Sequence, residues 1–169
     1  MWTAGSGADQ RIIEDIHQAT NLPATTNVTA AIRALHHLGV KKVAVAMGFT
    51  VPSRNSAVEP HEIHKQFLRD NGFELASYEI LPHSRMYDVL RLPAETAADL
   101  AREARRQAPD AEGIYITCGR LDTLPIIAPL EDELGVPVVT ANQAWAWEAL
   151  RTLEIREPIS GFGRLLETI

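Results

Sequence analysis

The run GIYITCGRLDTLP, residues 113–125, begins as an apolar, partly β-branched segment and breaks into a glycine turn. A short apolar run of this kind, followed by a turn and a helix start, is typical of a buried strand in a parallel sheet. Parallel-sheet proteins place their chemistry at the carboxyl ends of their strands. The chain's only cysteine, Cys118, stands at that end of the predicted strand.

Three further short apolar runs have the same character: Val43–Met47, Phe73–Leu81 and Val136–Thr140. Each is bounded by Gly, Pro or polar residues, and helix-period patterns separate them. The expected helices are Val28–Leu38, Pro60–Asn71, Pro93–Ala108, Leu124–Leu134 and a last one from Asn142 through Leu153. Strands alternating with such helices predict an α/β fold, a three-layer parallel sheet of about four strands with flanking helices and right-handed crossovers.

Residue types at the ends of these helices indicate their caps. Asn27 and Asn142 are the expected N-caps of the first and last helices, because an asparagine side chain accepts a hydrogen bond from the first turn. Gly39 and Gly135 are the expected C-terminal stops, because glycine adopts the left-handed conformation there.

Composition restricts the partners and the location. The 169 residues suffice for one domain. The net charge of −6 makes nucleic acid and anionic membrane surfaces poor partners. No apolar stretch approaches the ~18 residues of a membrane span, and no signal core is present. A single cysteine cannot form an internal disulfide, which fits a reducing compartment, and we expect a cytoplasmic protein.

The two ends of the chain have the look of a second, incomplete lobe. The turn WTAGSG normally follows a strand, yet none precedes it, and the helix Ala8–Ala19 comes next. The tail carries apolar residues that need a covering surface. We expect three parts: a remnant of a first lobe (1–27), a second α/β lobe (28–150), and a C-terminal segment that packs back on the first-lobe side (151–169).

Two interpretations of Cys118 stay open from the residues alone. Backbone N–H groups and the positive end of the next helix favour the thiolate, which is the reactive form of cysteine. Gly119 lets a ligand approach the backbone closely. A buried cysteine also commonly serves as a small apolar core residue.

Two other motifs have simpler interpretations. His61 and His64 flank Glu62 with the spacing i, i+3, whereas zinc proteases need i, i+4, so we expect a solvated helix face and no metal site. The turn WTAGSGAD, residues 2–9, is either an anion cradle or a plain N-capping turn with Ser6 or Asp9 as the cap.

Residues 116–151, ITCGRLDTLPIIAPLEDELGVPVVTANQAWAWEALR, resemble the second-cysteine segment of the aspartate/glutamate racemase superfamily. The branch they resemble is that of maleate cis–trans isomerase and arylmalonate decarboxylase. Residues 13–50 and 92–116 also resemble this branch, while 51–65 look like an insertion. The Cys-Gly-x-Leu-x-Thr-Leu pattern followed by Gly-Val-Pro-Val-Val is the specific part.

The resemblance implies two similar α/β lobes with the active site between them and no cofactor or metal. In the racemases and isomerases each lobe supplies a cysteine, whereas in the decarboxylase one second-lobe cysteine delivers a proton to an enediolate. Cys118 falls on that second-lobe position. The implied function is a cofactor-independent, cysteine-dependent isomerase, racemase or decarboxylase acting on a small carboxylic acid that resembles maleate or an arylmalonate.

Several positions depart from the family pattern. Trp2 stands where isomerases have their first cysteine, which closes a two-cysteine mechanism. Ala4 removes one hydroxyl, Phe49 replaces a tyrosine and removes a phenol, and Met86 stands at a substrate-binding asparagine. These changes make the site more apolar and closer to a decarboxylase pocket.

The expected site therefore has Cys118 as the catalytic residue. The expected substrate-binding residues are Thr3, Phe49, Met86, Thr117, Gly119 and Asn142. Thr3 would hold a carboxylate, Phe49 and Met86 would line the apolar side, and Gly119 would supply backbone donors.

Two alternatives remain open beside this function. The first is a truncated or degenerate relative that binds a ligand or partner without catalysis. The second is a flavodoxin-like nucleotide or flavin binder, for which the chain offers no phosphate loop. By the resemblance the chain begins midway through the first lobe. Either the true start lies upstream or a partner covers the exposed face, and we expect a homo-oligomer.

Overall fold

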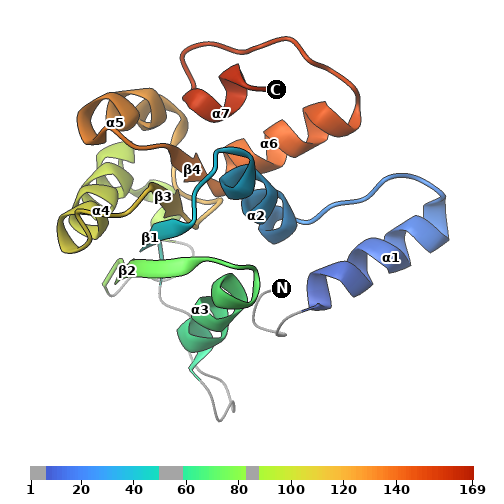
Figure 1. The fold of residues 1–169 in the computed structure, drawn as a ribbon, viewed down its shortest axis with the longest axis horizontal. Helices are drawn as coiled ribbons and strands as arrows, with labels where there is room; N and C mark the ends of the chain where they lie inside the picture. The colour runs from blue at the N-terminus through green and yellow to red at the C-terminus, as the bar shows by residue number, and fades with distance from the viewer. Residues whose placement is uncertain (1–6, 50–58, 83–87) are drawn as a thin grey trace.

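Four parallel strands form the centre of the computed structural model, which describes residues 7–49, 59–82 and 88–169 (Figure 1). They lie in the order β2-β1-β3-β4. Their bounds are β1 Lys42–Met47, β2 Glu74–Ile80, β3 Gly113–Ile116 and β4 Val138–Thr140. Each lies within one of the four predicted runs or extends it by one residue, and the predicted parallel α/β fold is confirmed.

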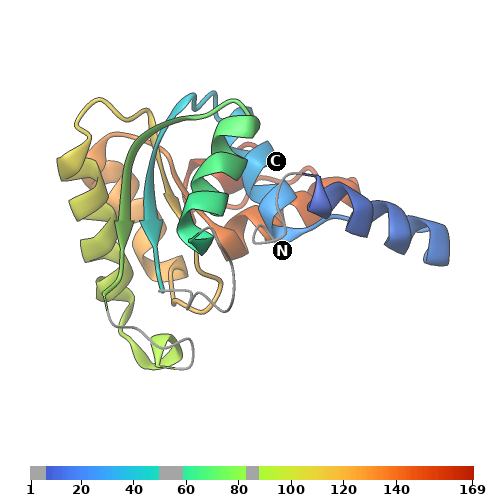
Figure 2. The same ribbon diagram turned by 90° about the horizontal axis from the view of Figure 1, so that it is seen from below.

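Helices cover both faces of this sheet (Figures 1 and 2). The helices are α1 Ala8–Thr20, α2 Asn27–His37, α3 Pro60–Asp70, α4 Ala94–Gln107, α5 Ile127–Leu134, α6 Ala141–Thr152 and α7 Arg164–Glu167, with short 3₁₀ turns at Val89–Arg91 and Leu124–Ile126. α4 and α5 pack on one face, and α2, α3, α6 and α7 pack on the other. The result is the predicted three-layer arrangement.

Each strand sends alternate side chains into two separate cores. On β1, Val43 and Val45 join the core beneath α2 and α3, while Ala44 and Ala46 join the core beneath α4. The small alanines of β1 face an alanine-rich helix, α4, and this pairing lets helix and sheet approach closely. Burial on both faces explains why the strands are continuous apolar runs without polar alternation.

The strands that follow β1 in the chain lie on opposite sides of it in the sheet, β2 on one side and β3 on the other. The chain passes from β1 through α3 to β2 on one side, then crosses through α4 to β3 on the other side. The carboxyl ends of β1 and β3 therefore lie at a topological switch point, where open α/β sheets bind their ligands. A hydrogen bond from Thr117 N to Ala46 O, 2.9 Å long, joins the two strands there.

α2 and α6 lie side by side in one layer, joined by an ion pair between Arg33 and Glu148. The N-cap of each helix is a threonine rather than the predicted asparagine. Thr26 accepts from Thr29 N, and Thr140 forms a capping box with Gln143. The prediction of Asn27 and Asn142 as caps was wrong because the extended threonine comes first and the asparagine already lies within the helix. Gly39 and Gly135 adopt the left-handed conformation, as expected.

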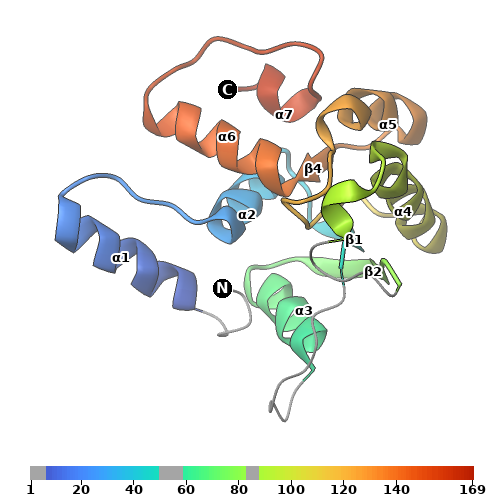
Figure 3. The same cartoon turned by 180° about the vertical axis from the view of Figure 1, so that it is seen from behind.

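α1 extends away from the α/β body as an arm (Figures 1 and 3). Its first turn contacts the body through Asp9, whose carboxylate accepts a 2.8 Å hydrogen bond from the Thr29 hydroxyl. Asp9 does not cap the helix, because Gly7 is the N-cap and no side chain caps it. None of the helices in the described part of the chain has the length and apolar content needed to cross a membrane.

The C-terminal segment packs on the α2/α6 layer. Leu165 and Leu166 are buried in the core of that layer, and Gln143 donates to Phe162 O at 2.6 Å. The tail thus finds its covering surface on this lobe, and the three-part division of the chain stays a prediction.

Replacing the observed cap should destabilise the fold, and replacing the expected one should not. Thr140→Ala removes the capping box, and we expect the free energy of unfolding to fall by about 1 kcal/mol. Asn142→Ala, at an exposed position two residues on, should cost less than about 0.5 kcal/mol. Urea denaturation followed by circular dichroism measures both. Equal losses would contradict the assignment of the cap.

Candidate active site

Cys118 lies two residues beyond the end of β3, at the switch point, and is 5% exposed. It packs directly against Gly48, which follows β1. A Cβ atom added to Gly48 would lie 2.5 Å from Cys118 Cβ and 3.2 Å from its Sγ. Real Cβ atoms do not approach this closely, so a glycine at position 48 is required for the thiol to occupy this place.

A cavity of about 120 Å³ opens beside the thiol. Its lining residues come from four separated parts of the chain: Asn27, Val28, Phe49, Tyr115, Thr117, Cys118, Gly119, Arg120 and Ala141. Nucleotides and drug-sized ligands occupy sites of roughly 300–1,000 Å³. The cavity beside Cys118 is therefore of a size for a small acid, which argues against the flavin or nucleotide alternative.

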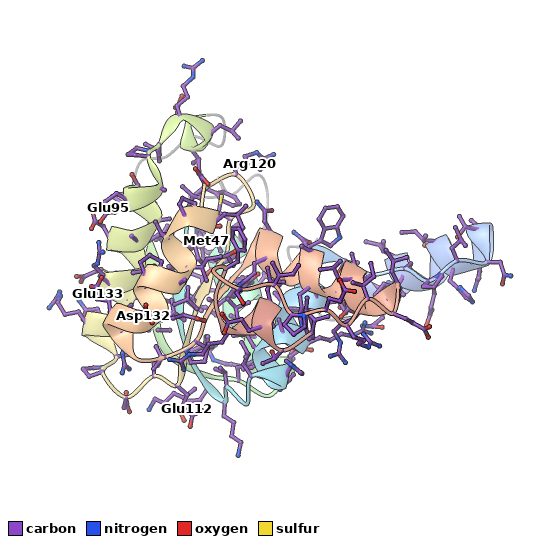
Figure 4. The ribbon with its side chains drawn as sticks, turned by 90° about the horizontal axis from the view of Figure 1, so that it is seen from above. Met47, Glu95, Glu112, Arg120, Asp132 and Glu133 are labelled. Carbon is purple, nitrogen blue, oxygen red and sulfur yellow. The ribbon has the colours of Figure 1, made fainter. Side chains whose placement is uncertain are left out.

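Helix ends give this cavity a positive electrostatic character. Asn27 and Val28 begin α2, and Ala141 begins α6, so the N-termini of two helices of more than ten residues converge on one hollow. Helix N-termini present free N–H groups and a partial positive charge to anions. Arg120 adds a full positive charge, and its side chain projects from the opposite end of the molecule to Glu112 (Figure 4). The cavity is suited to a carboxylate.

A wider groove, about 540 Å³, lies at the other ends of the same helices. It is lined by the C-terminal parts of α2 and α6, including His37, Trp147 and Arg151. Helix C-termini carry partial negative charge, and basic side chains such as Arg151 commonly lie there because they interact favourably with it. We therefore assign the chemistry to the smaller cavity, which contains the thiol.

The structure brings together four of the predicted site residues. Cys118, Thr117, Phe49 and Gly119 line the same cavity. Asn142 is not a lining residue, but its Nδ2 donates a 3.1 Å hydrogen bond to the O atom of Gly119, which is one. Thr3 and Met86, with Trp2 and Ala4, lie outside the described residues. No group of three or more His, Cys, Asp or Glu side chains suited to a metal occurs in the ranges described.

Sequence reasoning missed Tyr115 and Arg120. Tyr115 is 3% exposed and lies on the same face of β3 as Thr117, two residues away. The alternation of side chains along a strand was a signal that could have placed it beside the site. Burial raises the pKa of Tyr115 to about 12, although a hydrogen bond from Thr117 opposes that shift. Tyr115 is therefore a neutral phenol at neutral pH.

The prediction that His61 and His64 form a solvated face was wrong. Both are buried, and His64 is only 1% exposed. His64 Nδ1 lies 2.7 Å from the Tyr78 hydroxyl, and its ring lies 6.3 Å from that of Tyr115. Burial lowers the pKa of His64 to about 3, so its ring is neutral in the folded protein. The i, i+3 spacing places both histidines on the face of α3 that packs on the sheet.

Fold and site together define a class: a parallel α/β lobe that presents one thiol, at its switch point, to a small cavity lined by two helix N-termini. The model of the arylmalonate decarboxylase family matches residues 2–166. The chain belongs to that family.

Curated relatives agree with this assignment. The arylmalonate decarboxylase of Bordetella bronchiseptica is 31% identical over 164 residues, which cover 96% of this chain and 65% of that protein. The maleate isomerase of Pseudomonas putida is 27% identical over 148 residues, or 85% of this chain and 54% of that protein. The chain thus spans about two thirds of the decarboxylase and about half of the isomerase.

Solved structures show the same fold. Unliganded arylmalonate decarboxylase superposes with a TM-score of 0.85 at 30% identity, over 98% of this chain and 69% of that one. A maleate isomerase structure from Pseudomonas putida S16 gives 0.84 at 24% identity, over 98% and 66%. The predicted membership of the maleate isomerase and arylmalonate decarboxylase branch is confirmed.

Gly48→Ala should disturb the position of the thiol. The new methyl group would overlap the Cβ of Cys118 and Leu121 Cδ1, and we expect the free energy of unfolding to fall by about 1–3 kcal/mol. The control is Gly119→Ala, whose methyl group would meet only the side chain of exposed Asn142. That exposed side chain can move at the cost of its hydrogen bond to Gly119 O, so the loss should be smaller. A Gly48→Ala protein as stable as wild type would contradict the close contact.

Proposed function

We propose that the chain acts in the cofactor-independent decarboxylation of a small malonate-type acid, with Cys118 as the proton donor. The observation that carries the proposal is the placement of this thiol in a small cavity on which the N-termini of α2 and α6 converge. The 31% identity to an arylmalonate decarboxylase supports this chemistry. The single free cysteine supports a cytoplasmic location.

The cavity can assist both stages of such a reaction. The bond between Cα and one carboxylate breaks, CO₂ leaves, and the electron pair remains on the other carboxylate and Cα as an enediolate. The two helix N-termini and the N–H groups of the turn at Gly119 stabilise that developing charge. The apolar ring of Phe49 contacts the substrate's own apolar group.

Protonation completes the reaction. Cys118 transfers its S–H proton to Cα, and the resulting thiolate takes a proton from water. Racemisation of an α-carbon needs a proton donor on each face, whereas this chain has a single thiol. The proton is therefore delivered to one face, which favours decarboxylation over racemisation.

Loss of the thiol should abolish most of the turnover. With phenylmalonate as substrate, Cys118→Ala should lower kcat by roughly 10²–10⁴-fold, the usual contribution of a general acid. Chromatography of the phenylacetate formed measures the rate, and unchanged thermal unfolding shows that the variant is folded. Maleate is assayed in parallel to detect isomerisation.

Two outcomes would overturn the proposal. Equal rates in wild type and Cys118→Ala would remove Cys118 from the mechanism. A wild-type protein without turnover, in which phenylacetate still protects Cys118 from iodoacetamide, would favour the non-catalytic ligand binder.

We also propose that the protein self-associates through α1. This arm carries half-buried Ile12 and Ile13, and exposed Ile16 and Leu22 continue the apolar surface. A mainly apolar groove beside it, lined by residues that include Pro23, Ala149 and Leu153, extends that surface. Contiguous apolar patches of this kind mark interaction sites. A second copy of the chain carries the same apolar surface on its own α1, so two copies can cover each other's patches.

Light scattering tests the association. We expect wild type to be larger than a monomer and Ile16→Glu to shift it towards monomer, because a charge in the contact would be buried. Gln18→Glu adds the same charge elsewhere on α1 and should leave the mass unchanged. A monodisperse wild-type monomer would contradict the proposal.

A further inference from the structure

Tyr115, which was not among the predicted site residues, contributes a polar side chain to the cavity beside Cys118. It rises from β3, three residues before the thiol, and lines the cavity together with Phe49. Phe49 offers no hydrogen-bonding atom. Among the aromatic side chains that line the cavity in the described structure, Tyr115 is the one with a hydroxyl group.

Tyr115 has Thr117 and Cys118 as neighbours on the wall of the cavity. A hydrogen bond with the Thr117 side chain lowers the pKa of Tyr115, against the larger effect of burial. The charge of a Cys118 thiolate has the opposite effect on the same pKa, which indicates that phenol and thiol are close neighbours. Because a phenol has one O–H to donate and lone pairs that accept, Tyr115 can accept from the Thr117 hydroxyl and donate to a ligand in the cavity that both residues line with Cys118.

Tyr78 provides an internal comparison. It lies on β2 and pairs with Val45, which pairs in turn with Tyr115, so both tyrosines lie in one row across the sheet on one face. The ring of His64 contacts both of them. The Tyr78 hydroxyl bonds to His64 Nδ1 at 2.7 Å, and Tyr78 is not among the residues that line the cavity.

We propose that Tyr115 is a substrate-contacting residue, whose phenol O–H donates a hydrogen bond to a carboxylate oxygen of the acid bound beside Cys118. The proposal rests on the proposed function for the class of ligand. A neutral phenol donor gives a charge-assisted bond to an anion without adding a competing charge. The removal of such a donor should weaken binding by about 10- to 100-fold.

Two isosteric variants test this role. We expect Tyr115→Phe to weaken phenylacetate binding by that factor, measured as protection of Cys118 from iodoacetamide. Tyr78→Phe removes a hydroxyl from the same row and face but not from the cavity, and it should leave the protection unchanged. Equal affinities in Tyr115→Phe and wild type, or equal losses in both variants, would overturn the assignment.

The double variant Tyr115→Phe/Phe49→Tyr gives a positive test. It returns a phenol to the lining of the cavity at another position, and we expect part of the lost affinity to recover, which a merely structural role for Tyr115 would not produce. No recovery together with a lowered Tm in Tyr115→Phe would count as a structural role and overturn the proposal.

Activity assays keep the two proposals separate. Lost phenylacetate protection in Tyr115→Phe, with no phenylmalonate turnover even in wild type, refutes the proposed decarboxylation and supports the contact with Tyr115. Turnover of phenylmalonate by wild type, with an unchanged kcat/KM in Tyr115→Phe, supports the proposed decarboxylation and refutes the contact with Tyr115.

Wild-type protein supplies a measurement that needs no folded Tyr115 variant. The chain has three tyrosines, so protein labelled with ¹³C at tyrosine Cζ gives three NMR signals, and Tyr78→Phe and Tyr87→Phe assign two of them. Saturating phenylacetate should shift the remaining Tyr115 signal and leave that of Tyr78 in place. An unmoved Tyr115 signal would overturn the proposal.

Discussion

The contact between Gly48 and Cys118 is the constraint on which the rest of the site depends. β1 and β3 are neighbours in the sheet, and the chain leaves β1 through α3 on one side of the sheet but reaches β3 through α4 on the other. Only a residue without a side chain at position 48 lets Cys118 lie between the two strand ends. The cavity lies at the switch point beyond these two strand ends, and the thiol lies beside it because the glycine leaves room for the cysteine side chain.

The sheet and its helices could be predicted because their signals are local. Runs such as Val43–Met47 are apolar on both faces, and parallel strands between two helix layers require this pattern. Cys118 could be placed at a functional edge for the same reason, since a strand followed by a glycine turn marks a carboxyl end. The family resemblance then gave its role a chemical meaning that the spacing of residues does not contain.

The parts that escaped prediction depend on distant contacts. His64 and Tyr78 are separated by a helix and a turn, and the i, i+3 pattern of the histidines is compatible with either solvent or a sheet. Their burial follows from the strand order, which no local pattern specifies. The prediction of the helix caps was wrong for a more local reason. Thr26 and Asn27 are both good capping residues, and only the backbone conformation determines that Thr26 is the cap.

The cavity also has a mechanical aspect. Its anion-binding wall consists of the first turns of α2 and α6, two helices held together further along by the ion pair of Arg33 with Glu148. Arg33 and Glu148 do not line the cavity, yet their ion pair joins the two helices whose first residues do.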